Sequence, residues 1–204
     1  MRADLTFDQI IVGRRSVRRF TERPVARADL LALIEAACWA PSPHGTQPWR
    51  FAVLSTAAPK QRLAAAMADE WRRQLALDGQ DADVVDERVR ISRLRITSAP
   101  VVIVPCLFGG DLDRYPDPLR QQAELTMATQ SLGCAVQNLL LAAYARGLDA
   151  GWMCAPLFCP ETVVAALGLD ESLIPHALIP VGYAAQDPAR RPRRPLAELM
   201  IEVE

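Results

Sequence analysis

The chain has 204 residues, of which 50% are hydrophobic and 23% are charged, and its formal net charge is −1. This composition excludes a disordered chain, a disulfide-stapled module and a membrane-dominated protein, and it provides no overall positive field for binding nucleic acid or anionic lipid. We expect a single domain over residues 1–204, long enough to bury an apolar core.

Hydrophobic periodicity and turn residues divide the chain into helices and strands. Thr6 and Gln9 have the spacing of a capping box, Pro41 is an expected helix stop, and Pro105 argues for an end or an irregularity in its strand. In chain order we predict a helix from Thr6 to near Gly13, a helix over 30–37, a strand over 49–54, helices over 60–77 and 83–96, a strand over 101–107, a helix over 119–146, a strand over 150–154, a helix over 161–167 and a strand over 177–183.

The last 21 residues, 184–204, differ in composition from the rest of the chain. Three prolines and four arginines lie between residues 186 and 199. Such a segment is typical of an extended arm and not of an independent domain.

The cysteines and the N-terminus bear on the cellular compartment. The five cysteines have no CxxC spacing, which indicates a reduced, cytoplasmic setting. Asp4 and Asp8 stand where a signal peptide requires a basic region, so we expect no export or membrane segment.

Several common catalytic motifs are missing from the sequence. There is no GxSxG, no HExxH, and only two histidines, so we expect no metal site and no hydrolytic centre. GxGxxG and GxxxxGK are also absent, so side chains would have to hold a phosphate-bearing ligand.

Two arginine runs are the candidates for that task. A guanidinium offers a planar, permanently charged fork that suits phosphate oxygens, and Ser16 could add a hydroxyl donor. The alternative is that both runs are solvated surface charge. The runs are Arg14, Arg15, Arg18 and Arg19 near one end and Arg190, Arg191, Arg193 and Arg194 near the other.

A stiff loop, PSPHGTQPW, occupies residues 41–49. Its three prolines restrict the backbone, and Gly45 would let the chain pass close to a flat ligand. Gln47 supplies both a donor and an acceptor. A rigid connection that ends in a core tryptophan, Trp49, is the alternative reading.

Four motifs together resemble the FMN-dependent nitroreductase superfamily in order and spacing. They are RRSVRRF at 14–20, APSPHGTQPW at 40–49, QNLLLAAYARGLDAGW at 137–152 and VGYAAQDPARRPRRPLAEL at 181–199. The resemblance implies an α+β three-layer sandwich with a central mixed sheet. It also implies a homodimer whose C-terminal arm embraces the partner, with FMN at the subunit interface.

The resemblance also implies roles for individual positions. The arginine runs would hold the ribityl chain and phosphate, residues 41–47 would line the isoalloxazine ring, and the segment after Trp152 would bring backbone amides near flavin N5. No side chain is expected to be catalytic, because the flavin itself carries the chemistry. The implied cofactor-binding residues are Arg14, Arg15, Ser16, Arg18, Pro41, Ser42, Pro43, Gln47, Ala155, Pro156, Leu157, Arg191 and Arg193.

The loop departs from the common nitroreductase pattern PSxxNxQPW, because Gly45 replaces the asparagine. A narrower similarity fits better, to the flavin domain of the bifunctional ligase that matures the deazaflavin coenzyme F420. It is carried by Pro43 and His44, YPD at 115–117, Arg120 and AELTM at 123–127.

That similarity suggests that His44, Tyr115 and Arg120 contact a large anionic substrate. The alternatives are a structured loop histidine, a loop anchor and a surface arginine.

Three functions stay open: the resemblances imply the first two, and the absence of an identifiable acid, base or nucleophile motivates the third. The first is FMN-dependent reduction of an unsaturated coenzyme F420 precursor, the second is a general NAD(P)H-dependent nitroreductase or quinone reductase, and the third is a non-catalytic flavin or deazaflavin binding protein. The expected electron donor is a reduced nicotinamide or a reduced deazaflavin.

Overall fold

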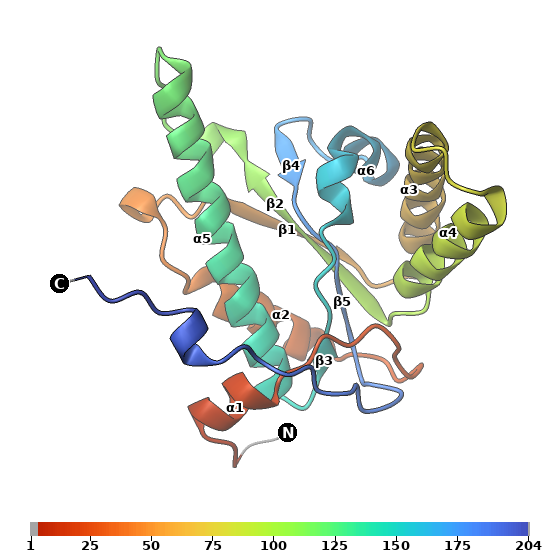
Figure 1. Ribbon diagram of the computed structural model, residues 1–204, viewed down its shortest axis with the longest axis horizontal. Coiled ribbons are helices and arrows are strands. Elements are labelled where there is room, and N and C mark those ends of the chain that lie inside the picture. Colours follow the sequence, from red (N-terminus) through yellow and green to blue (C-terminus); the bar gives the residue numbers. More distant parts are fainter. Residues whose placement is uncertain (1–3, 204) are drawn as a thin grey trace.

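The computed structural model describes residues 4–203 and shows a sheet covered by helices on both faces (Figure 1). The helices are α1 (Phe7–Gly13), α2 (Arg27–Cys38), α3 (Ala57–Leu77), α4 (Ala82–Thr97), α5 (Pro118–Ala145) and α6 (Pro160–Leu167). The strands are β1 (Trp49–Leu54), β2 (Val101–Phe108), β3 (Asp149–Ala150), β4 (Leu173–Pro175) and β5 (Ile179–Gly182). Short 3₁₀ turns are η1 (Pro43–Gly45), η2 (Gly109–Asp111), η3 (Ala155–Phe158) and η4 (Leu196–Glu198). Across residues 4–203, no helix combines the length and apolar character that a bilayer-spanning segment requires.

The sheet has the strand order β1-β2-β5-β3, and β4 also pairs with β2. All four ladders are antiparallel. A parallel bridge between Ser16 and Ala150 adds the N-terminal segment beside β3 and gives the sheet its mixed character.

The central strand β2 shows why the sheet is covered on both sides. Val101, Ile103 and Leu107 pack into the cluster that includes residues of α2 and α5. Val102 and Val104 face the opposite way, toward the cluster that includes residues of α3 and α6. A strand that is buried on both faces has a continuous apolar sequence, as β2 does. The predicted three-layer α+β sandwich is confirmed.

Pro105 lies inside β2 rather than at its end. It stands opposite Phe51 of β1, and its carbonyl on the other side of the strand accepts the His176 N–H at 2.9 Å. On that side β5 pairs up to Ile103 and β4 begins at Cys106. Pro105 has no N–H to donate, and it lies where β4 replaces β5 as the neighbour of β2. This change of neighbour is the irregularity that the proline predicted.

The strand predicted over 150–154 is regular only at Asp149–Ala150. Further along, Gly151 donates its N–H to the Pro180 carbonyl, and a single bridge joins Met153 to Leu178. The chain stays beside β5 without forming a continuous ladder. The sequence pattern missed β4, which has only three residues.

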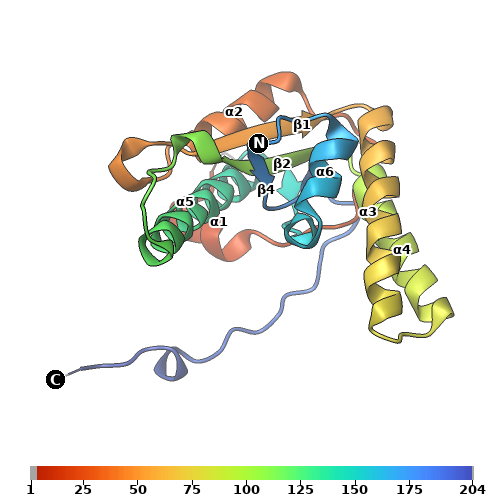
Figure 2. The ribbon, with the colours of Figure 1, turned by 90° about the horizontal axis from the view of Figure 1, so that it is seen from above.

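The C-terminal segment begins on the sheet and then leaves it. Ala184 bridges Phe20, the Thr21 N–H donates to the Tyr183 carbonyl at 2.8 Å, and the Ala185 N–H donates to the Arg19 carbonyl at 3.1 Å. Arg190 still lies beside α1, and beyond residue 193 the chain extends away from the helices and the sheet (Figure 2).

Candidate functional site

The N-terminal arginine run lies along the edge of the sheet next to β3. The Val17 N–H donates to the Ala150 carbonyl at 3.0 Å. Gly151 permits this approach, because a Cβ at that position would overlap the Val17 carbonyl oxygen. We call this region, comprising residues 14–19, β3 and the tail base 184–193, the β3 corner.

Arg14 and Arg193 carry neighbouring positive charges at the β3 corner. Burial lowers the pKa of the Arg14 guanidinium, and the charges of Arg193 and Arg15 lower it further. The Nε of Arg14 is buried and has no hydrogen-bond partner within the described part of the chain. A partly buried guanidinium with cationic neighbours and an unused donor is suited to an anionic group such as a phosphate.

Arg15 makes contacts of a different kind. Its Nη1 donates to the carbonyls of Val12 and Arg14, at 2.7 Å each, and so caps the end of α1. Part of the guanidinium is therefore engaged by the backbone, and the role of Arg15 toward a cofactor stays a prediction. Ser16 is exposed beside it.

A second cation group at this corner contains a residue that the sequence analysis missed. Burial lowers the pKa of Arg95 of α4, and the charges of Arg18 and Arg19 lower it further. Arg95 has no acidic residue three or four positions away, whereas Arg90 on the same helix has Glu87. Arg88 and Arg93 of α4 also have no such partner, so helical spacing alone does not single out Arg95.

The η3 turn, which contains the predicted residues Ala155–Leu157, follows the β3 corner along the chain. Pro156 is buried, while Ala155 and Leu157 are exposed. Among the described residues, the Ala155 N–H meets no acceptor. The turn is thus anchored by its proline, and its exposed first residue offers a free backbone donor.

The predicted ring-lining loop, residues 41–47, has a strained and internally braced backbone. His44 and Gln47 have positive φ angles of 53° and 49°, and Gly45 between them has 69°. The Gln47 N–H donates to Ser42 Oγ at 3.0 Å. Non-glycine residues rarely adopt such angles, and they cluster at functional sites.

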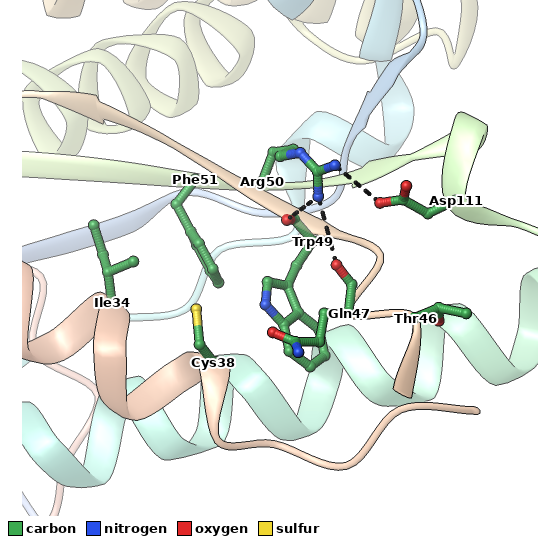
Figure 3. A pocket seen from close by; sticks show the side chains of 8 residues that line it. All are labelled: Ile34, Cys38, Thr46, Gln47, Trp49, Arg50, Phe51 and Asp111. Atoms are coloured by element: carbon green, nitrogen blue, oxygen red, sulfur yellow. Dashed lines mark hydrogen bonds and ion pairs between the residues drawn. The ribbon is translucent and has the colours of Figure 1, made fainter. Parts of the chain in front are cut away.

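A hollow of about 510 Å³ opens beside this loop (Figure 3). Arg50 lies across it, with Nη1 donating to the Trp49 carbonyl at 2.9 Å and Nη2 paired to Asp111 at 3.0 Å. The lining residues are Ile34, Cys38, Thr46, Gln47, Trp49, Arg50, Phe51 and Asp111. We call the region formed by residues 41–51 and 108–120 the β1 corner.

The other predicted substrate residues also lie in the β1 corner. The Arg120 guanidinium stacks over the Tyr115 ring at 5.3 Å and pairs with Asp117 at 2.5 Å. The structure brings Tyr115 and Arg120 together, but the Arg120 charge already has a carboxylate partner. His44 is exposed in the nearby loop.

Strand registers show that the two corners are far apart within one chain. Ser16, Ala150, Val181 and Val101 form one row across the sheet, at the start of β2. The Pro48 carbonyl instead binds the N–H of Phe108, at the other end of β2. Seven residue steps at about 3.3 Å give about 23 Å along the strand. The corners also lie at opposite edges of the sheet, so one chain does not unite all the predicted cofactor-binding residues.

Comparisons with known proteins agree with this architecture. A protein from Thermus thermophilus named NADH dehydrogenase is 29% identical over 92% of this chain and 91% of its own length. A protein from Desulfovibrio desulfuricans, solved in complex with FMN, is 29% identical over 98% of both chains, with a TM-score of 0.74. The FMN-dependent nitroreductase NfnB from Mycobacterium smegmatis, solved with NADPH, is 25% identical over 97% of both chains, also with a TM-score of 0.74.

The family assignment rests on most of the sequence. Residues 11–183 match the model of the nitroreductase family, which spans the β3 corner up to the start of the tail, the strained loop and the η3 turn. The chain belongs to the nitroreductase family.

Proposed function

We propose that this chain binds FMN with the phosphate at the β3 corner and transfers electrons from NAD(P)H to a small electrophilic acceptor. As a nitroreductase-family protein it is an FMN-dependent oxidoreductase. The observation that carries the binding mode is the neighbouring pair Arg14 and Arg193, with the buried, unpartnered Nε of Arg14. When bound, FMN supplies the two-electron chemistry, and the protein binds and orients it.

Different residues along the sheet edge would bind different parts of the cofactor. Arg14, Ser16 and Arg193, together with Arg18 and Arg191, would hold the phosphate and the ribityl chain. The flavin ring would then lie further along the edge, toward η3, where the free Ala155 N–H is available. A cationic end followed by a backbone donor suits an elongated ligand with one anionic end.

We further propose that a second copy of the chain completes the site. The loop 41–47 lies at the opposite corner from the arginines, so a partner chain would supply it. The tail provides an arm for that association, because it extends away from its own chain (Figure 2). Its apolar side chains are also exposed. They are Leu196, Leu199, Met200, Ile201 and Val203.

For the acceptor, two observations favour different substrates. The open hollow beside Gln47 suits small nitroaromatics or quinones, in line with the NADPH-bound nitroreductase relative. The stacked Tyr115 and Arg120 offer a flat platform for a larger ring, which favours an unsaturated precursor of coenzyme F420. Because Asp117 already pairs with Arg120, the anionic part of that precursor would have to compete with this carboxylate.

A reconstitution experiment tests the proposal. Purified protein is incubated with excess FMN, desalted, and assayed for retained flavin and for bleaching by NADH, NADPH or a reduced deazaflavin. Stoichiometric flavin that NAD(P)H bleaches supports the proposal, and turnover of a nitroaromatic or of the dehydro-coenzyme then identifies the acceptor. A protein that retains no flavin refutes it, and retained flavin that no donor reduces indicates a binding protein.

A further inference from the structure

A chain of hydrogen bonds that begins on α3 ends at the η3 turn. Gln74 Nε2 donates to the Phe158 carbonyl oxygen at 3.0 Å and to Glu70 Oε1 at 2.7 Å. Arg73 Nη2 in turn donates to both carboxylate oxygens of Glu70, at 2.8 and 2.7 Å. Arg73 thus fixes Glu70, and Glu70 fixes the orientation of the Gln74 amide.

The Gln74 contact reaches the far end of the η3 turn, where the backbone bond from the Cys159 N–H to the Pro156 carbonyl at 3.1 Å also acts. Leu157 is 51% exposed and Phe158 is 73% exposed, so neither side chain is packed into the core. Among the side chains of residues 4–203 that belong to other elements, Gln74 alone forms a hydrogen bond with the turn. The other side-chain bond, from Cys159 Sγ to the Ala155 carbonyl at 3.7 Å, joins the turn to the next residue of the chain.

The charge of Glu70 is also felt where η3 meets α6. Burial raises the pKa of the Cys159 thiol, and the Glu70 carboxylate raises it further. Cys159 is the residue that separates η3 from α6. The Arg73–Glu70–Gln74 group therefore contacts η3 by hydrogen bond and the following residue by electrostatic interaction.

We propose that Gln74 is a positioning residue, which sets the place of the η3 turn, and with it the free Ala155 N–H, against the bound flavin. The inference rests on the proposed function, because it requires FMN to lie along the β3 edge. A backbone donor beside the flavin ring tunes its electronics only if its position is fixed, and a displacement of about 1 Å can cost up to about 100-fold in rate.

The experiment compares Gln74→Met with Arg72→Ala in the FMN-loaded protein. Methionine keeps the length and apolar packing of the side chain but removes the donor. Arg72 lies two residues away on the same helix and pairs with Asp69 and Asp86, away from η3, so its loss is the matched control. The readouts are the midpoint potential of bound FMN, kcat and KM for NADPH, and amide hydrogen exchange of residues 155–159 without flavin.

We expect Gln74→Met to speed exchange in 155–159 and to lower kcat about tenfold, with KM changed less than twofold. The preference for reduced over oxidised FMN should change about tenfold, or about 30 mV for a two-electron couple. Arg72→Ala should change none of these.

The inference is overturned if both variants share the wild-type potential and kcat, even where Gln74→Met has a lower Tm. If Gln74→Met does not fold, Gln74→Leu, which also removes the donor and adds no charge beside Glu70, gives the same comparison. Wild-type protein that binds no FMN refutes the proposed function instead, so the two failures are distinguishable.

Discussion

Arg73 and Arg90 of the α3–α4 hairpin and Arg14 of the β3 corner are the same type of residue in opposite surroundings. On the hairpin, Arg73 pairs with Glu70 and Arg90 pairs with Glu87, each at 2.7 Å. At the β3 corner, Arg14 lies near Arg193 with a buried Nε that has no partner among the described residues. Arginine is so abundant in this chain that the number of arginines does not identify a phosphate site. The presence or absence of a carboxylate partner distinguishes surface charge from a candidate phosphate site.

The unpaired arginines of the β3 corner destabilise the ligand-free protein. Neighbouring like charges repel each other in the ligand-free protein, and a bound dianion would turn that repulsion into attraction. The hairpin pairs are already neutralised and gain nothing from a ligand.

The largest effect is expected from Arg14→Met, which keeps the apolar stem and removes the charge. FMN affinity should fall by about 1.5–3 kcal/mol, the scale for hydrogen bonds to charged groups, or about 10- to 150-fold. Flavin fluorescence titration of the FMN-free protein measures it. An unchanged Kd would place the phosphate elsewhere and return the arginine run to solvated surface charge.

Gly151→Ala should displace the arginine run without changing any arginine. The new Cβ would overlap the Val17 carbonyl oxygen, which is backbone and has little freedom to move. Overpacking of this kind costs about 1–3 kcal/mol. Urea unfolding measures the loss, and FMN affinity should fall as well, whereas Gly133→Ala, where a Cβ meets nothing within 4 Å, should leave FMN affinity unchanged.

The fold could be predicted largely from the sequence, because long periodic segments dominate it. The capping box Thr6–Gln9 forms as expected, and the helix predicted over 119–146 is α5. The three-residue strand β4 was missed, and β3 is shorter than the strand predicted over 150–154, since neighbouring strands define both segments and neither has a periodicity of its own.

The site was predictable in its residue types and less so in its arrangement. The two arginine runs are far apart in the sequence, and only the pairing of residues 19–21 with 183–185 brings them together. Sequence spacing did not reveal that the loop 41–47 lies at the opposite corner, or that Arg95 joins Arg18. Both depend on the strand order, which follows from tertiary packing.

A smaller effect, of opposite sign, is expected for the stability of the FMN-free protein. Arg14→Met removes the repulsion with Arg193 and Arg15, so the Tm should rise by about 1 °C, as expected for a like-charge contact of a few tenths of a kcal/mol. Added salt should reduce the difference, because it screens the repulsion in the wild type. Differential scanning calorimetry at low and high ionic strength measures both, and a lower Tm would show that Arg14 is structural.

The smallest effect is expected on the hairpin. Arg90→Ala removes a fully exposed pair with Glu87, whose carboxylate pKa is lowered by the Arg90 hydrogen bond. Exposed pairs of this kind are screened by water and salt, and many contribute nothing measurable. We therefore expect Tm and FMN affinity to match the wild type in the experiments used for Arg14→Met. If Arg90→Ala weakened FMN binding as much as Arg14→Met did, carboxylate pairing would not separate the two classes of arginine, and total charge would be the better explanation of flavin affinity.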